Sequence, residues 1–117
     1  MRVLIVDDEE AICMFVEYAI NDAGYETLTA SNGKAALELV KSNPDIEIVI
    51  SDVKMSGMSG VELYENIKKI RTNVKKFILI TGFSDLDLTE DNLKGITALI
   101  SKPIDMNLLL SHISDKK

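Results

Sequence analysis

The stretch VISDVKMSG, residues 49–57, carries an apolar, β-branched run directly into the carboxylate of Asp52. Such a run is typical of a central strand in a parallel sheet, because helices cover both faces of that kind of sheet. Lys54 follows, and the residues after it are typical of a turn. Asp52 is therefore expected at the end of a central strand. A carboxylate at the end of a buried strand is costly, so its presence there has to be explained by its chemistry.

On both sides of this stretch, short runs rich in Val, Ile and Leu alternate with longer stretches of helical period. This alternation is the pattern of βαβ units around a parallel sheet. The predicted strands cover residues 2–6, 25–29, 45–51, 76–80 and 96–100. The right-handed crossover rule leaves few topologies for such strands. The predicted fold class is α/β, with a doubly wound five-stranded parallel sheet in the flavodoxin-like order 2-1-3-4-5 and helices on both faces.

Helices are expected between and after these strands. Asn32 is predicted to cap the second helix and Asp105 to cap the last. A third helix is predicted at residues 60–71, and residues 84–95 are predicted as a short or mobile helix. The first helix is expected to bury one apolar stripe, made of Ile12, Phe15, Val16, Ala19 and Ile20.

The composition limits the class of partner. The chain has 117 residues, 46% of them hydrophobic, which is enough for a single domain over residues 1–117 with its own core. Its formal net charge of -6 argues against a nucleic-acid or anionic membrane surface, because such surfaces need clustered Lys and Arg. The one cysteine, Cys13, cannot form an internal disulfide, and no targeting segment is recognisable, so a cytoplasmic location is expected.

The predicted strands end in polar residues that this topology brings to one rim of the sheet. The first strand leads into Asp7 and Asp8, the third into Asp52, the fourth into Thr81 and the fifth into Lys102. Three adjacent carboxylates repel one another and lose solvation, so a cation is expected among them. Lys102 offsets about one charge, and the remaining oxygen ligands suit Mg²⁺, which binds a few carboxylates and keeps several waters.

These groups together predict phosphoryl transfer. In that chemistry a carboxylate attacks in line, while cations and hydrogen-bond donors take up the charge on the phosphoryl oxygens. Asp52 is the best candidate nucleophile, because it stands alone on the middle strand. The glycine-rich motifs with which nucleotide-binding folds hold phosphate do not occur in the sequence.

Four segments, in their order and spacing, are similar to the receiver domain of bacterial two-component response regulators: LIVDDEEA, ISDVKMSGMSG, LITGF and ISKPID. The resemblance covers essentially the whole chain. It implies that Asp52 accepts a phosphoryl group from a sensor histidine kinase or a phosphotransfer protein. It also implies that Asp8, Asp52 and the backbone carbonyl of Lys54 bind Mg²⁺ directly, and that Asp7 acts through water.

The resemblance further implies how the phosphoryl group is held and read. Lys102 would pair with it, and Thr81 would hydrogen-bond it and move on activation. The peptide bond before Pro103 is expected to be cis. The implied function is a switch that catalyses its own phosphorylation and dephosphorylation, rather than a dedicated enzyme. No output domain follows in the 117 residues, so we expect either a stand-alone receiver or a domain excised from a larger protein. The face between Ser84 and Ile113 is the expected surface for a downstream protein or a homodimer.

The sequence departs from the family pattern at two positions. Ser56 stands where a proline is usual, which is expected to loosen the loop. Leu99 stands where Tyr or Phe is usual, and it lacks the ring that the usual switch moves. Lys54 and Phe83 occupy positions that flank the path of the hydrolytic water in this family, and we hypothesise that their bulk prolongs the life of the acyl phosphate.

Two other functions stay open. The first is a degenerate receiver that acts as a constitutive docking module, for which Leu99 and Ser56 are the hints. The second is a small Mg²⁺-dependent phosphohydrolase, which would need an acid or base where Lys54 stands and a lid domain. His112 is interpreted as a structural residue, because no His, Cys or carboxylate lies near it at ligand spacing.

Overall fold

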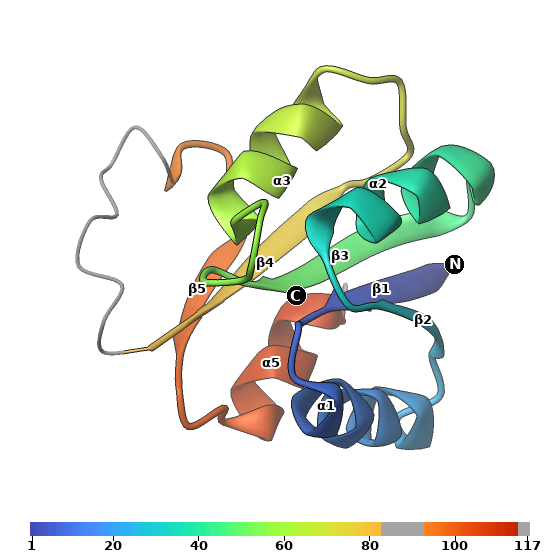
Figure 1. Cartoon of the computed structure of the whole chain (residues 1–117). Helices are drawn as coiled ribbons and strands as arrows, with labels where there is room; N and C mark the ends of the chain where they lie inside the picture. The colour runs from blue at the N-terminus through green and yellow to red at the C-terminus, as the bar shows by residue number, and fades with distance from the viewer. Residues whose placement is uncertain (83–92, 115–117) are drawn as a thin grey trace.

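A computed structural model gives the fold, and it describes residues 1–82 and 93–114. Strands and helices alternate from residue 2 to residue 81 (Figure 1). Phe83 and most of the predicted helix at residues 84–95 lie outside the described residues. None of the described helices is long and apolar enough to cross a membrane. The elements are β1 Arg2–Val6, α1 Glu10–Asp22, β2 Glu26–Ala30, α2 Gly33–Ser42, β3 Ile46–Asp52, α3 Gly60–Lys68, β4 Lys76–Thr81, β5 Ala98–Ser101 and α5 Met106–Ile113.

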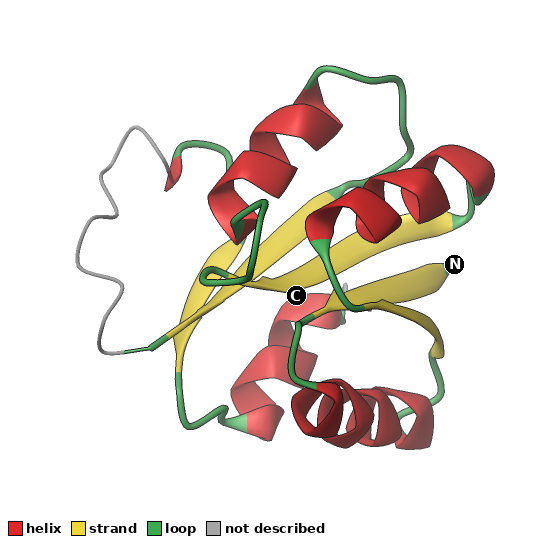
Figure 2. Ribbon diagram, in the orientation of Figure 1, coloured by secondary structure: helices red, strands yellow, loops and turns green. Residues whose placement is uncertain are grey.

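The strands form one parallel sheet in the order β2-β1-β3-β4-β5. α2 and α3 cover one face of the sheet, and α1 and α5 cover the other (Figure 2). β1, β3 and β4 are buried along almost their whole length, which agrees with their continuous apolar sequences. The predicted fold class and strand order are confirmed, and β3 is the central strand that ends at Asp52.

Alternate residues along the strands belong to two separate hydrophobic cores. Leu4 and Val49 pack in the core that α2 and α3 cover. Val3 and Ile50 point the other way and pack in the core that α1 and α5 cover. Each central strand is therefore fixed from both sides, and its C-terminal end is held in a defined position.

The stripe predicted for α1 is wrong at Phe15, which is 56% exposed. The buried residues of α1 are Cys13, Val16 and Ile20. Because each residue turns a helix by about 100°, Phe15 lies on the side opposite to Cys13 and points away from the sheet. Val16 and Ile20 belong both to the predicted stripe with Phe15 and to the observed stripe with Cys13. Packing of α1 against the sheet decides which of these two stripes is buried.

The ends of several elements differ from the predictions by a few residues. β5 begins at Ala98 rather than at residue 96, and α3 ends at Lys68 rather than at residue 71. The N–H groups of Lys69 and Ile70 bond the carbonyls three residues earlier, both at 3.2 Å. This tightening is typical of the last turn of a helix, so α3 stops there.

Both predicted helix caps are confirmed. The side chains of Asn32 and Asp105 accept hydrogen bonds from backbone N–H groups three residues later, at 2.7 and 3.2 Å. Ser59 and Glu62 form a reciprocal capping box at the start of α3, which the sequence analysis did not identify. The peptide bond before Pro103 is cis, as the family resemblance implied.

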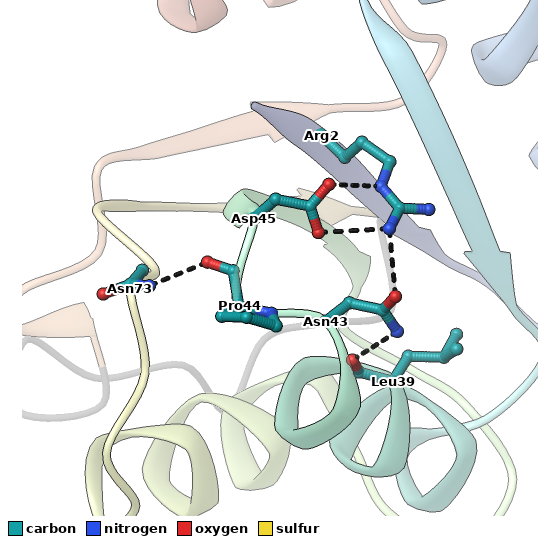
Figure 3. A network of polar contacts seen from close by, with 6 residues as sticks. All are labelled: Arg2, Leu39, Asn43, Pro44, Asp45 and Asn73. Atoms are coloured by element: carbon teal, nitrogen blue, oxygen red, sulfur yellow. Dashed lines mark hydrogen bonds and ion pairs between the residues drawn. The ribbon is translucent and has the colours of Figure 1, made fainter.

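A polar network fastens the N-terminal end of the sheet, opposite to the rim that carries Asp52 (Figure 3). Arg2 Nε donates to Asp45 Oδ2 at 2.6 Å, and Arg2 Nη2 donates to Asn43 Oδ1 at 3.0 Å. Asn73 Nδ2 donates to the backbone oxygen of Pro44 at 2.8 Å. The network ties β1 to the loops that precede β3 and β4.

Candidate functional site

Three carboxylates meet at the C-terminal rim of the sheet. Asp7 and Asp8 follow β1, and Asp52 ends the neighbouring strand β3. One oxygen from each carboxylate lies within 4.8 Å of the others. Asp7 and Asp52 are only 4% and 5% exposed, whereas Asp8 is exposed to solvent. A set of hard oxygen donors at this spacing fits a divalent cation such as Mg²⁺.

Backbone groups hold Asp7 in place. Its N–H donates to the oxygen of Ala30 at 3.2 Å, and its Oδ1 accepts the N–H of Glu9 at 2.9 Å. Burial raises the pKa of Asp7, although the Glu9 N–H and the charge of Lys102 act in the opposite direction. The ionised form of Asp7 is therefore costly, which is the electrostatic reason to expect a cation beside it.

Lys102 brings an ammonium group to Asp52. Its Nζ lies 3.3 Å from Asp52 Oδ1, and its backbone N–H donates to the oxygen of Thr81 at 2.7 Å. Burial acts to lower the pKa of Lys102, but the carboxylates of Asp52, Asp7 and Glu9 outweigh burial, and the pKa is raised. Lys102 therefore stays protonated at neutral pH and keeps its charge next to Asp52.

The loop from β3 to α3 borders the cluster. The N–H of Val53 donates to a carbonyl of β4 at 3.0 Å, and the N–H of Gly60 donates to Val53 O at 2.8 Å. A Cβ at Gly60 would collide with the carbonyl of Asp52, so only glycine allows this approach. Ser56 N–H donates to Asp8 Oδ2 at 3.1 Å. Sequence reasoning missed this contact, because no side-chain pattern records where a backbone N–H points.

The other predicted site residues lie close to Asp52 in the sheet or along the chain. Thr81 is buried at the end of β4, one residue beyond Ile80, which pairs with Asp52. Lys54 lies in the loop two residues after Asp52, and its side chain is exposed. His112, near the end of α5, does not belong to the acidic cluster found among the described residues.

The acidic pair opens into a cleft of about 320 Å³ between the start of α1 and the end of β2. A larger hollow of about 400 Å³ lies between α3 and the start of β4, and Lys68, Arg71 and Lys75 are among the residues that line it. No described carboxylate lines this second hollow, so it is separate from the site. The carboxylate of Asp52, the ammonium of Lys102 and an acidic cluster with the spacing of a divalent-ion site share one rim.

Known proteins are similar to this chain in sequence and in fold. The family model described as the response regulator receiver domain matches residues 3–114. The uncharacterized transcriptional regulatory protein YrkP of Bacillus subtilis is 41% identical over 112 residues, which cover 96% of this chain and 47% of that protein. Sporulation initiation phosphotransferase F of the same organism is 34% identical over 108 residues, which cover 91% of this chain and 85% of that protein.

The solved structures agree with the sequence matches. A response regulator receiver domain protein from Clostridium thermocellum is similar with a TM-score of 0.87 and 32% identity, over 96% of this chain and 90% of that chain. The chain spans about half the length of YrkP, because it matches 47% of that protein. The family match includes the strand ends that carry all three carboxylates. The chain therefore belongs to the receiver domain family of two-component response regulators.

Proposed function

We propose that the protein is a phosphorylation-dependent signalling switch. Asp52 accepts a phosphoryl group from a sensor histidine kinase or a phosphotransfer protein, and the phosphorylated form presents a changed surface to its partner. The observation that carries this proposal is the setting of Asp52, which is 5% exposed, has an ammonium at 3.3 Å and lies within 4.8 Å of two other carboxylates. A buried carboxylate with such neighbours is suited to act as a nucleophile.

The acidic cluster would hold Mg²⁺ during transfer. Asp8, Asp52 and the backbone carbonyl of Lys54 would bind the ion directly, and Asp7 would act through water. A bound ion supplies positive charge to the oxygens of the transferring group. The setting of Asp7 supports this assignment, because burial raises the pKa of Asp7 and a bound cation would offset the cost of its ionised form.

In the transfer step, one oxygen of Asp52 forms a bond to phosphorus as the phosphorus–nitrogen bond of the donor phosphohistidine breaks. The electron pair of the broken bond leaves with the histidine nitrogen. Lys102 pairs with the phosphoryl oxygens, and the hydroxyl of Thr81 donates a hydrogen bond to them. The burial of Asp52 limits the access of water to the new acyl phosphate.

A protein phosphodonor needs a docking surface near the acids, and α1 offers one. Met14, Phe15 and Tyr18 are 61%, 56% and 75% exposed on the side of α1 that faces away from the sheet. Adjacent apolar side chains in solvent are typical of interaction sites. Because α1 begins at Glu10, directly after the acidic pair, we assign its outward face, defined by these three residues, to the phosphodonor.

The downstream partner is assigned to the face between Ser84 and Ile113, part of which lies outside the described residues. Leu99, on β5, belongs to this face and is 43% exposed. A leucine has no ring or hydroxyl to exchange between two positions. We therefore expect phosphorylation to change the apolar surface that the downstream partner binds, without the rotation of an aromatic side chain at position 99.

Incubation with acetyl phosphate and Mg²⁺ tests the proposal. The parent chain should gain one phosphoryl group in an intact-mass measurement, and chelation of Mg²⁺ should prevent the gain. Asp52→Asn should gain none, because the amide is not a nucleophile. Asp22→Asn is the matched control, since Asp22 is exposed at the end of α1, and it should behave as the parent does. Phosphorylation of Asp52→Asn to the parental level would contradict the proposal.

The same experiment separates the two alternatives. A degenerate receiver that acts as a docking module would give no adduct on the parent chain with acetyl phosphate or with beryllofluoride. The observation in its favour is Leu99, which is exposed where an aromatic side chain is usual. A phosphohydrolase would instead turn over phosphate esters many times without a lasting adduct on Asp52.

A further inference from the structure

Ser56 makes a contact that the usual family residue cannot make. Its backbone N–H donates to Asp8 Oδ2 at 3.1 Å, across a separation of 48 residues in sequence. Proline, the usual residue here, has no N–H to donate. We propose that the Ser56 N–H is a positioning group that holds the Asp8 carboxylate ready for Mg²⁺, an inference that rests on the proposed function.

The three carboxylates differ in the hydrogen bonds and ion pairs that would hold them if this contact were absent. Asp52 faces the ammonium of Lys102 at 3.3 Å, and Asp7 accepts the N–H of Glu9 at 2.9 Å. Asp8 is exposed, and the N–H of Ser56 is its one side-chain hydrogen bond among the residues that the structure describes. Without this donor, the Asp8 side chain would have to lose its rotational freedom when the ion binds.

The loop that carries Ser56 is itself anchored, so the N–H has a defined position. Val53 N–H donates to the oxygen of Ile80 at 3.0 Å, and Gly60 N–H donates to Val53 O at 2.8 Å. Between these points Met55 is 9% exposed and packs in the core that α2 and α3 cover. The loop is therefore restrained although it lacks the usual proline. The N–H that serine has in place of proline adds a hydrogen bond from the loop to Asp8.

The geometry leaves Asp8 able to bind a cation at the same time. A carboxylate has about four lone-pair positions, and the Ser56 N–H occupies one of them. Groups that orient a metal ligand in this way typically change metal affinity by about 10- to 100-fold when they are lost. Because Asp8 is exposed, we expect an effect near the lower limit.

Mg²⁺ titration of three chains by calorimetry tests the inference. Ser56→Pro removes the N–H and should weaken Mg²⁺ binding by about tenfold. Ser56→Ala removes only the hydroxyl and keeps the N–H, so it should bind Mg²⁺ as the parent does. Equal affinities of all three chains would overturn the inference, and so would equal weakening by Ala and Pro. Absence of Mg²⁺ binding by the parent would instead overturn the metal requirement of the proposed function.

A second measurement needs no metal and no proline. In the metal-free chain, the amide hydrogen of Ser56 should exchange with solvent more slowly than it does in Asp8→Ala, as followed by nuclear magnetic resonance. The hydrogen bond to Asp8 is the cause of the expected protection. Unchanged exchange in Asp8→Ala would overturn the inference even if Ser56→Pro failed to fold. Faster exchange confined to the loop around Ser56 would support it.

Discussion

At the scale of single residues, the three aspartates of the cluster are held by different kinds of atoms. Asp52 faces a side-chain ammonium, whereas Asp7 and Asp8 each accept a backbone N–H. A substitution at Lys102 would therefore disturb Asp52 directly. No side-chain deletion at Glu9 or Ser56 would remove the donors that hold the other two aspartates, because those donors belong to the main chain.

Cys13 lies beside this cluster and is expected to be unreactive in the folded protein. Its Sγ is 3.4 Å from the backbone oxygen of Asp7. Burial raises the pKa of Cys13 to about 11, and the charge of Asp7 acts in the same direction. At pH 8 only about one thiol in a thousand is then ionised, and the thiolate is the reactive form.

Alkylation of Cys13 by iodoacetamide at pH 8 should be slower by more than about a hundredfold in the native chain than in the chain unfolded in urea. The rate should rise about tenfold for each pH unit between pH 8 and pH 10 in the native chain, because the thiolate fraction rises in this way. Intact-mass measurement at successive times gives both rates. Similar rates in the native and unfolded chains would show that the thiol is accessible and ionised.

At the scale of elements, the rotation of α1 decides which residues are core and which are surface. The buried side carries Cys13, Val16 and Ile20, and the opposite side carries Phe15 and Tyr18. Truncation of an exposed side chain costs little stability but can remove a large part of a binding contact. The outward face of α1 should therefore affect partner binding more than folding.

Phe15→Ala should slow phosphotransfer from a histidine kinase by about tenfold, since an apolar anchor in an interface is worth about 1–2 kcal/mol. Its rate with acetyl phosphate should stay at the parental level, because this small donor needs no docking surface. Leu108→Ala is the matched control, since Leu108 is 45% exposed on a different helix, α5. An equal loss with both donors would mean that Phe15 acts on the site itself.

At the scale of the whole molecule, the buried carboxyl of Asp7 in the acidic rim reduces the stability of the metal-free fold. Burial raises the pKa of Asp7, so the folded state binds a proton at this carboxyl more readily than the unfolded chain does. The ionised form therefore lowers the free energy of unfolding. This loss begins as the pH rises above about 4, the ordinary carboxyl pKa, and is complete above the raised pKa.

Asp7→Asn should raise the free energy of unfolding of the metal-free chain at pH 7, by an amount on the order of 1 kcal/mol. Asn keeps an oxygen that can accept the Glu9 N–H, so the variant removes mainly the charge. The gain should shrink as the pH falls from the raised pKa of Asp7 towards about 4, and it should be lost below about 4, where Asp7 is protonated in the folded and the unfolded chain. Urea unfolding at several pH values measures both effects.

Mg²⁺ should reverse the difference in the free energy of unfolding between the parent and Asp7→Asn. A ligand that binds only the folded state raises the free energy of unfolding by about 2.7 kcal/mol at a concentration of 100 times its Kd. The parent should therefore gain more stability from Mg²⁺ than Asp7→Asn does. Asp22→Asn, which alters an exposed carboxyl, should follow the parent throughout. If Mg²⁺ raised the free energy of unfolding equally in Asp7→Asn and in the parent, Asp7 would not contribute to Mg²⁺ binding.

The sequence by itself determined the fold class and the position of the acidic rim. β1, β3 and β4 are apolar along almost their whole length, and such strands need helices on both faces. Parallel strands end at the same edge, so the polar residues that follow or end these strands had to share one rim. Asp7, Asp8 and Asp52 were predictable because residue type and strand end together carry this information. Lys102 was predictable in the same way, since it follows β5 of the same parallel sheet.

Only the tertiary structure decided the rotation of α1 and the contact between Ser56 and Asp8. Val16 and Ile20 fit two overlapping stripes, and packing against the sheet selected the one that leaves Phe15 in solvent. The Ser56 N–H is a group that every residue except proline carries, so the residue type gives no sign of its partner. Its direction depends on the path of the folded loop, and that path is set by hydrogen bonds from Val53 and Gly60.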